Sequence, residues 1–136
     1  LFREDMKDYQ AKAEAVRAAE VYMDAFAIST CPAEGIESPT IVGAQAANEL
    51  LEIRGIKASS VLTDYNGTVY FSARSIDEVN VQVMMEKLGG GGHRTIAGAQ
   101  MKDVTVEEAK TRLKEVIQEM MSEGQVSCSR SFSECL

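Results

Sequence analysis

Four consecutive glycines followed by a histidine and an arginine are the residues of this chain with the clearest capacity for chemistry. They are Gly89 to Gly92, His93 and Arg94, and His93 is the single histidine of the sequence. Glycines leave backbone N–H groups accessible, and an imidazole and a guanidinium add further donors for an anion. The stretch therefore predicts a phosphate-binding loop of bare, converging amides. A flexible linker is the alternative, although linkers usually mix glycine with serine and charged residues.

The loop does not match the better-known phosphate-binding motifs. No Gly-Lys-Ser/Thr follows the glycines, and the Gly-x-Gly-x-x-Gly spacing fails at Arg94 and Thr95, so a P-loop or Rossmann site is excluded. Gly91 is expected to need either a backbone conformation or a close ligand approach that a Cβ would obstruct.

The net charge and the composition limit which ligands the chain can bind and which class of protein it belongs to. The formal charge of −7 over 136 residues argues against a general nucleic-acid binder, because phosphate-backbone affinity needs clustered Lys and Arg. Between residues 80 and 101 the charged residues are Glu86, Lys87 and Arg94, a balance that suits a nucleotide-sized anion. Hydrophobic residues make up 45% and charged residues 26%, as in one globular domain.

No apolar run approaches the roughly 18 residues that span a bilayer, and no secretory leader opens the chain. We therefore expect a cytoplasmic location without direct membrane contact. Cys31, Cys128 and Cys135 are an odd number without metal-type spacing, so they are expected to be free thiols.

The glycine stretch lies between a short helix and a strand. Asn80 is expected to cap this helix and Gly89 to stop it. Helical spacing predicts that its apolar residues face the core: Val81, Met84, Met85 and Leu88. Residues 96–102 predict a strand, and Thr105 with Glu108 predicts a capping box for a helix that runs to residue 121.

The first half of the chain completes an α/β pattern. The pattern begins with an Ala-rich helix, a buried strand and a second helix, which has Ser38 as its N-cap and Pro39 at its first position. A hairpin with Asn66-Gly67 as its turn follows. The expected ranges are 2–20 for the first helix, 21–29 for a single strand, Pro39 to before Gly55 for the second helix, and 58–65 with 68–74 for the hairpin. These elements predict an α/β domain with a mixed sheet of four or five strands and flanking helices, preceded by a linker helix.

Several of these segments together resemble the DHH-associated domain that follows the catalytic domain of DHH phosphodiesterases. The resemblance is carried by Ser72-Ala73-Arg74-Ser75, Glu78 to Gln82, Met85 to Leu88, and Gly89 to His93 with Ala97-Gly98. It covers residues 1–123 and is strongest to bacterial cyclic-di-AMP phosphodiesterases. It divides the chain into a helical linker over 1–20, a substrate-binding domain over 21–123, and a tail over 124–136 whose origin and role stay open.

The resemblance implies a domain that binds substrate while a separate DHH domain of the same chain holds two manganese ions. This chain has no Asp-His-His motif, so neither a cofactor nor a catalytic residue is expected in it. The implied substrate-binding residues are Arg74, Ser75, Asn80, Gly89, Gly90, Gly91, Gly92, His93 and Arg94. They meet only if the loop folds back beside the start of the short helix, and His93 is the candidate for a transition-state contact in the intact enzyme.

Simpler interpretations remain for three of these residues. Arg74 could be a surface ion-pair residue, Asn80 only a helix cap, and His93 a turn histidine with satisfied hydrogen bonds.

The implied ligand is a cyclic dinucleotide or a short oligonucleotide, and the implied partner is the missing DHH domain. The resemblance also allows a homodimer and an upstream membrane anchor in the intact protein. Two other functions stay open: a single-stranded nucleic-acid-binding domain of a RecJ-like exonuclease or oligoribonuclease, and a non-catalytic domain for nucleotide sensing or dimerisation. The acidic charge and the lack of a series of aromatic residues count against the first, whereas apolar surface on the first helix would favour the second.

Overall fold

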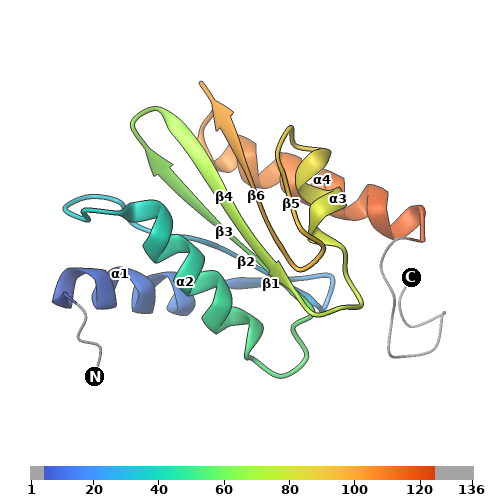
Figure 1. The fold of residues 1–136 in the computed structure, drawn as a ribbon, viewed down its shortest axis with the longest axis horizontal. Coiled ribbons are helices and arrows are strands. Elements are labelled where there is room, and N and C mark those ends of the chain that lie inside the picture. The colour runs from blue at the N-terminus through green and yellow to red at the C-terminus, as the bar shows by residue number, and fades with distance from the viewer. Residues whose placement is uncertain (1–4, 125–136) are drawn as a thin grey trace.

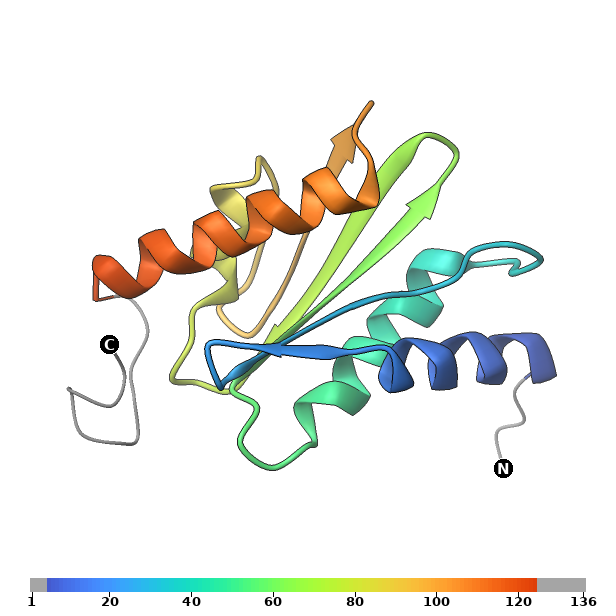
Figure 2. The same ribbon diagram turned by 180° about the vertical axis from the view of Figure 1, so that it is seen from behind.

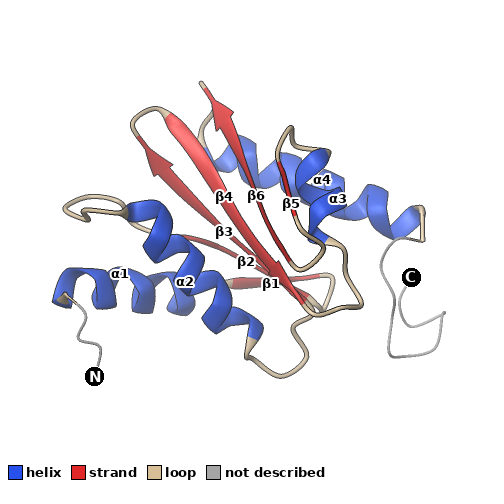
Figure 3. Ribbon diagram, in the orientation of Figure 1, coloured by secondary structure: helices blue, strands red, loops and turns tan. Residues whose placement is uncertain are grey.

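A six-stranded sheet with helices on both faces organises residues 5–124, the part of the chain that the computed structural model describes (Figure 1). The elements are α1 (Met6–Arg17), β1 (Glu20–Tyr22), β2 (Phe26–Thr30), α2 (Pro39–Leu51), β3 (Ala58–Tyr65), β4 (Thr68–Ser75), α3 (Val81–Glu86), β5 (Gly91–Gly92), β6 (Ile96–Lys102) and α4 (Val106–Ser122). The strands lie in the order β1-β2-β3-β4-β6-β5, parallel between β2 and β3 and antiparallel elsewhere (Figure 3). The prediction of an α/β domain with a mixed sheet is confirmed.

The sheet has six strands where four or five were predicted. The single strand expected over 21–29 is wrong: Met23 and Asp24 adopt φ angles of 52° and 64° and turn the chain, so β1 and β2 pair with each other. This turn uses no glycine or proline, and the sequence therefore gives little sign of it. The glycine stretch adds the second unexpected strand, β5, which pairs with β6.

Capping groups begin α3 and α4 where the sequence predicts, whereas α1 ends at Arg17 and not at the predicted residue 20, which belongs to β1. Asn80 Oδ1 accepts the Val83 N–H at 3.2 Å at the start of α3. In the α4 capping box, Thr105 Oγ1 accepts the Glu108 N–H at 3.0 Å and Glu108 Oε1 accepts the Thr105 N–H at 2.9 Å. Ser38 occupies the N-cap of α2, but its side chain makes no capping hydrogen bond.

Two hydrophobic clusters lie on opposite faces of the sheet, and Figure 2 shows α4 crossing the face opposite α2. On the α4 face, Met84 and Met85 of α3 are fully buried, as their spacing predicts. On the other face, α1 packs against α2 through Ala11 and Ala15. The helix predicted as a linker thus has a packing partner within this chain.

Strand alternation assigns the side chains of the hairpin to the two faces. β3 and β4 pair along their whole lengths, as predicted. Val69, Phe71 and Ala73 belong to the cluster under α3 and α4, so the alternate residues of β4 face α2: Tyr70, Ser72 and Arg74. α2 packs against β3 and β4. In Figure 1 no helix of the described residues crosses in front of β6 or β5 on that face. We call this uncovered area the open strip.

Cys31 is a free thiol, as predicted, and is buried between the helices and β2. Burial raises the pKa of this thiol to about 11. Cys128, Cys135 and the predicted tail after Gly124 lie outside the described residues. Within residues 5–124, every helix is too short or too polar to cross a membrane.

Candidate functional site

Arg74 and His93 lie in one row across the open strip. Arg74 of β4 pairs with Ile96 of β6, and the His93 N–H donates to the Ile96 carbonyl oxygen at 2.7 Å, which continues the row to the end of β5. Cross-strand partners in an antiparallel sheet share a face. The Arg74 Nε donates to Asn48 Oδ1 of α2 at 2.9 Å, which fixes this face as the α2 face.

The neighbouring row is made of small residues. Ser72 of β4 pairs with Gly98 of β6, and Gly98 pairs with Gly91 of β5. A Cβ at Gly91 would meet no atom within 4 Å, and Gly91 has no positive φ. The expectation of a special backbone conformation at Gly91 is therefore wrong, and the alternative expectation, close approach of a ligand, stays a prediction.

The backbone amides of the glycine stretch are mostly engaged within the chain. Gly89 has a φ of +86° and stops α3, as predicted, and its N–H donates to Glu86 O at 3.0 Å. The Gly90 N–H donates to Met85 O at 2.8 Å, and the His93 N–H is bound to β6. The stretch is thus a helix end followed by an edge strand, which corrects the expectation of four bare amides converging on a ligand.

Ser75, Asn80 and Arg94 are bonded within the chain itself. Ser75 is buried and its hydroxyl donates to a backbone carbonyl at 2.6 Å, while Asn80 caps α3. The Arg94 guanidinium donates to the Asp77 carbonyl oxygen at 2.8 Å and pairs with the Asp77 carboxylate at 3.3 Å. Ser75 and α3 lie on the face opposite Arg74, so the structure does not bring these side chains into one cleft.

The loop nevertheless folds back as the resemblance implies. The N–H of Val81, at the start of α3, donates to the Arg94 carbonyl oxygen at 2.9 Å, and the Ser75 hydroxyl also donates to that oxygen at 3.3 Å. These bonds hold the turn after β5 beside the start of α3. They thereby set where the end of β5, and with it His93, lies on the open strip.

The two polar side chains of the first row have no acidic partner among residues 5–124. The His93 imidazole is exposed and makes no hydrogen bond with a described residue, unlike a satisfied turn histidine. Arg74 is half-buried, and this burial lowers the pKa of its guanidinium, which remains charged because its usual pKa is so high. Its partners are the neutral oxygens of Asn48 and Ala73, so its positive charge is not neutralised.

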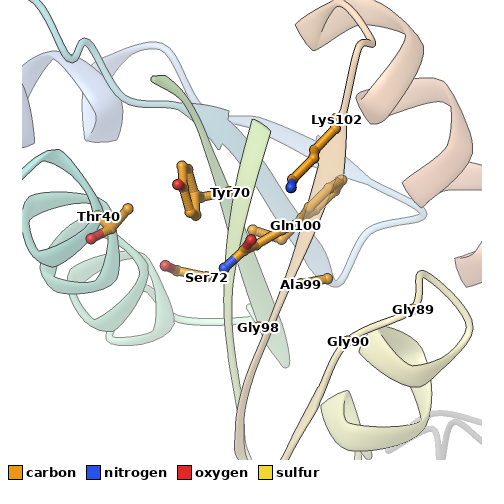
Figure 4. Close-up of a pocket in the computed structure, with 10 residues that line it drawn as sticks. Thr40, Tyr70, Ser72, Gly89, Gly90, Gly98, Ala99, Gln100 and Lys102 are labelled. Atoms are coloured by element: carbon orange, nitrogen blue, oxygen red, sulfur yellow. The ribbon is translucent and has the colours of Figure 1, made fainter. Parts of the chain in front are cut away.

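A cavity of about 540 Å³ continues the open strip between α2 and β6 (Figure 4). Gly89 and Gly90 form one rim of this cavity. Its polar walls come from three elements: Thr40 of α2, Tyr70 and Ser72 of β4, and Gln100 and Lys102 of β6. None of these five residues was predicted as a site residue, and Ser72 was named only among the residues that carry the family resemblance. The alternation of apolar and polar residues along β4 is the signal that could have found two of them.

The described residues provide no suitable set of ligands for a metal ion. Among the described residues, no group of three or more His, Cys, Asp and Glu is placed to hold a metal ion. The residues present therefore do not fit a two-manganese centre.

Comparisons with known proteins agree with this architecture. Residues 25–123 match the family model of the DHHA1 domain. The chain is 43% identical over 112 residues to the cyclic-di-AMP phosphodiesterase PdeA of Listeria monocytogenes, covering 82% of this chain and 17% of that protein. It is 41% identical over 125 residues to the cyclic-di-AMP phosphodiesterase GdpP of Geobacillus thermodenitrificans, covering 91% of this chain and 19% of that protein.

A solved structure shows the same fold. An exopolyphosphatase-related protein from Bacteroides fragilis superposes with a TM-score of 0.74 at 19% sequence identity, over 87% of this chain and 36% of that chain. The chain spans less than one fifth of the length of the two curated relatives, 17% and 19%.

Proposed function

Because the chain belongs to the DHHA1 domain family, we propose that it is the substrate-binding lobe of a phosphodiesterase that hydrolyses cyclic-di-AMP or a related short dinucleotide. The names of the Listeria and Geobacillus relatives support this ligand class. Since the chain spans only a small part of each relative, the activity belongs to the proposed whole protein. The role of this lobe is to bind and orient the substrate.

The observation that carries the proposal is the row of Arg74, Ile96 and His93 on the open strip. A phosphodiester carries its negative charge on two non-bridging oxygens, which accept hydrogen bonds. The guanidinium of Arg74 and the imidazole of His93 are donors of the kind that bind such oxygens, and charge-assisted bonds are about twice as strong as neutral ones. Neither group is neutralised by a described carboxylate, so both are free to take a phosphate.

The adjoining row of Ser72, Gly98 and Gly91 gives that phosphate room. Gly98 and Gly91 have no side chains, and Ser72 has a small one that donates or accepts a hydrogen bond. A phosphate or ribose can therefore lie directly against the sheet beside the Arg74 row. This is the role we propose for the glycine stretch in place of an amide nest.

We also propose that a separate DHH domain of the intact protein holds the two manganese ions implied by the family resemblance. Metal ions of this kind activate a water molecule for attack on phosphorus. The described residues of this chain provide no ligand set for them. This lobe contributes instead by positioning the phosphate, which raises the rate by holding the reacting groups in alignment.

Titration of the isotope-labelled chain with cyclic-di-AMP, followed by NMR, tests the proposal. We expect saturable shifts of the Gly91 and His93 amides and weaker binding by Arg74→Gln and His93→Ala. Arg112→Gln removes the same charge on α4, across the sheet, and should bind like the wild type. Binding is expected to be weak, because one lobe makes only part of the contacts. An affinity unchanged by both row variants contradicts the proposal.

A further inference from the structure

The cavity beside the row of Arg74 and His93 contains a combination of side chains that, apart from Ser72, the proposed function does not use. Tyr70 contributes an aromatic ring, Gln100 a carboxamide, and Lys102 an ammonium group, while Ser72 and Thr40 contribute hydroxyls. Figure 4 shows Gln100 and Lys102 reaching from β6 over the floor of the cavity toward the side lined by Tyr70 and Ser72. The cavity volume of about 540 Å³ lies within the range of small-molecule sites.

Three of these side chains make no polar contact with the described residues. Gln100 and Lys102 are exposed, and neither makes a hydrogen bond or an ion pair with a described residue. Tyr70 is half-buried, and its hydroxyl is likewise without a described partner. On the opposite face of β4 the corresponding positions, such as Phe71, are packed in the core. The polar and aromatic groups on the cavity side are therefore available to a ligand.

We propose that this cavity binds the adenine base of the substrate, with the base against the Tyr70 ring and its edge read by the Gln100 carboxamide. The inference rests on the proposed function and extends it from the phosphate to the base. Aromatic side chains give sequence-tolerant stacking affinity for a base, and a carboxamide adds the selectivity.

The spacing along β6 fits one nucleotide. Gly98, in the small row, and Gln100 are two residues apart on the same face, which is about 7 Å along a strand. A phosphate held beside Gly91 and Gly98 would thus be separated from Gln100 by the length of a ribose. Lys102 lies two residues further along the same face and places a positive charge at the far end of the cavity, in a chain whose net charge is −7.

The carboxamide also explains a preference between purines. Adenine presents a donor, N6–H, beside an acceptor, and a glutamine amide matches both at once. On the edge that carries N7, guanine presents O6 and N7, two acceptors, so the carbonyl oxygen of a Gln100 carboxamide that reads this edge would face an acceptor and remain unpaired. We therefore expect AMP to bind better than GMP, by an amount that depends on Gln100.

The test is a calorimetric or NMR titration of the 136-residue chain with AMP, GMP and ribose 5-phosphate, which lacks the base. AMP should bind about tenfold more tightly than ribose 5-phosphate, the scale of one stacked base. Tyr70→Leu should remove this advantage and leave ribose 5-phosphate binding unchanged, whereas Tyr70→Phe should keep it. Gln100→Leu should bring AMP and GMP to equal affinity. Tyr9→Leu, at an exposed tyrosine of α1 outside the cavity, is the matched control.

The outcomes separate this inference from the proposed function. If His93→Ala weakens all three ligands but AMP binds no better than ribose 5-phosphate, the phosphate row stands and the base site is overturned. If AMP keeps its advantage in Tyr70→Leu, the base binds elsewhere and the inference is again overturned. If AMP binding depends on Tyr70 but not on His93 or Arg74, the base site stands and the phosphate row fails. Absence of saturable binding by any of the three overturns both.

Discussion

Alanine at Gly90 should destabilise the domain, whereas alanine at the adjacent Gly91 should leave its stability unchanged or raise it slightly. A Cβ at Gly90 would lie 2.1 Å from the Gly98 carbonyl oxygen and 2.7 Å from the Ala99 Cα. Both are backbone atoms, so no rotamer change can relieve the overlap. A Cβ at Gly91 would meet nothing within 4 Å.

The size of the effect follows from the hydrogen bonds that must break. Relief at Gly90 requires β5 to move away from β6, which loses the Gly91–Gly98 pairing, the His93–Ile96 bond and the bond from the Gly90 N–H to α3. At roughly 1 kcal/mol for each bond, Gly90→Ala should lower the free energy of unfolding by about 2 to 3 kcal/mol. For a domain of this size that is a fall in Tm of about 6 to 15 °C.

Gly91→Ala should not destabilise the domain. Because alanine restricts the unfolded chain more than glycine and meets no obstacle here, the free energy of unfolding should stay constant or rise by up to about 1 kcal/mol. Its methyl group would project onto the open strip, so binding of cyclic-di-AMP should fall, and the larger Gly91→Val should abolish it.

Urea unfolding followed by circular dichroism measures both free energies, and unchanged m-values would show that the unfolded reference is the same. Wild-type stability of Gly90→Ala would refute the close contact of β5 with β6. An equal loss in both variants would refute the assignment of Gly91 to the open face. A folded Gly91→Val that binds cyclic-di-AMP like the wild type would refute the role of the small row.

Four further outcomes are expected. In the proposed intact phosphodiesterase, His93→Ala should lower kcat by about two orders of magnitude, the scale of a lost transition-state donor, with a smaller change in substrate affinity. The Tm of the isolated domain should not change, and a lowered Tm with normal turnover would make His93 structural. Thr105→Ala should cost about 1 kcal/mol in urea unfolding, because α4 loses its N-cap. Cys31, with its pKa raised to about 11, should be alkylated far more slowly in the native chain than in urea, as mass spectrometry of its peptide would show. The chain alone should not hydrolyse cyclic-di-AMP in the presence of manganese, and hydrolysis seen by chromatography would show that it holds its own metal centre.

The candidate site could be predicted only in part. Asn80 and Thr105 were found because capping acts over three or four residues, and the Asn66-Gly67 turn because its φ angles are a local property. Arg74 and His93 were singled out by residue type and by resemblance. That they share a row follows only from the pairing of β4 with β6 and of β6 with the end of β5.

The remaining site residues depended on which face of the sheet was left uncovered. Tyr70 is distant in sequence from the glycine stretch, and Gln100 and Lys102 belong to no recognisable motif. No spacing rule links the three residues. They line one cavity because α2 covers β3 and stops short of β6. Ser75, only one residue from Arg74, was placed on the opposite face by the same alternation.

The sequence by itself determined the α/β class, the caps of α3 and α4, the hairpin and the family, because these depend on local backbone preferences, on hydrophobic periodicity and on motif residues close together in the chain. The tertiary structure alone decided that the glycine stretch forms an edge strand, that β1 and β2 are separated by a turn, and that Arg74 and His93 lie together while Ser75 and Asn80 do not. The physical reason is that strand register and helix placement are set by contacts between residues distant in sequence, and a shift of one residue in register moves a side chain to the other face of the sheet.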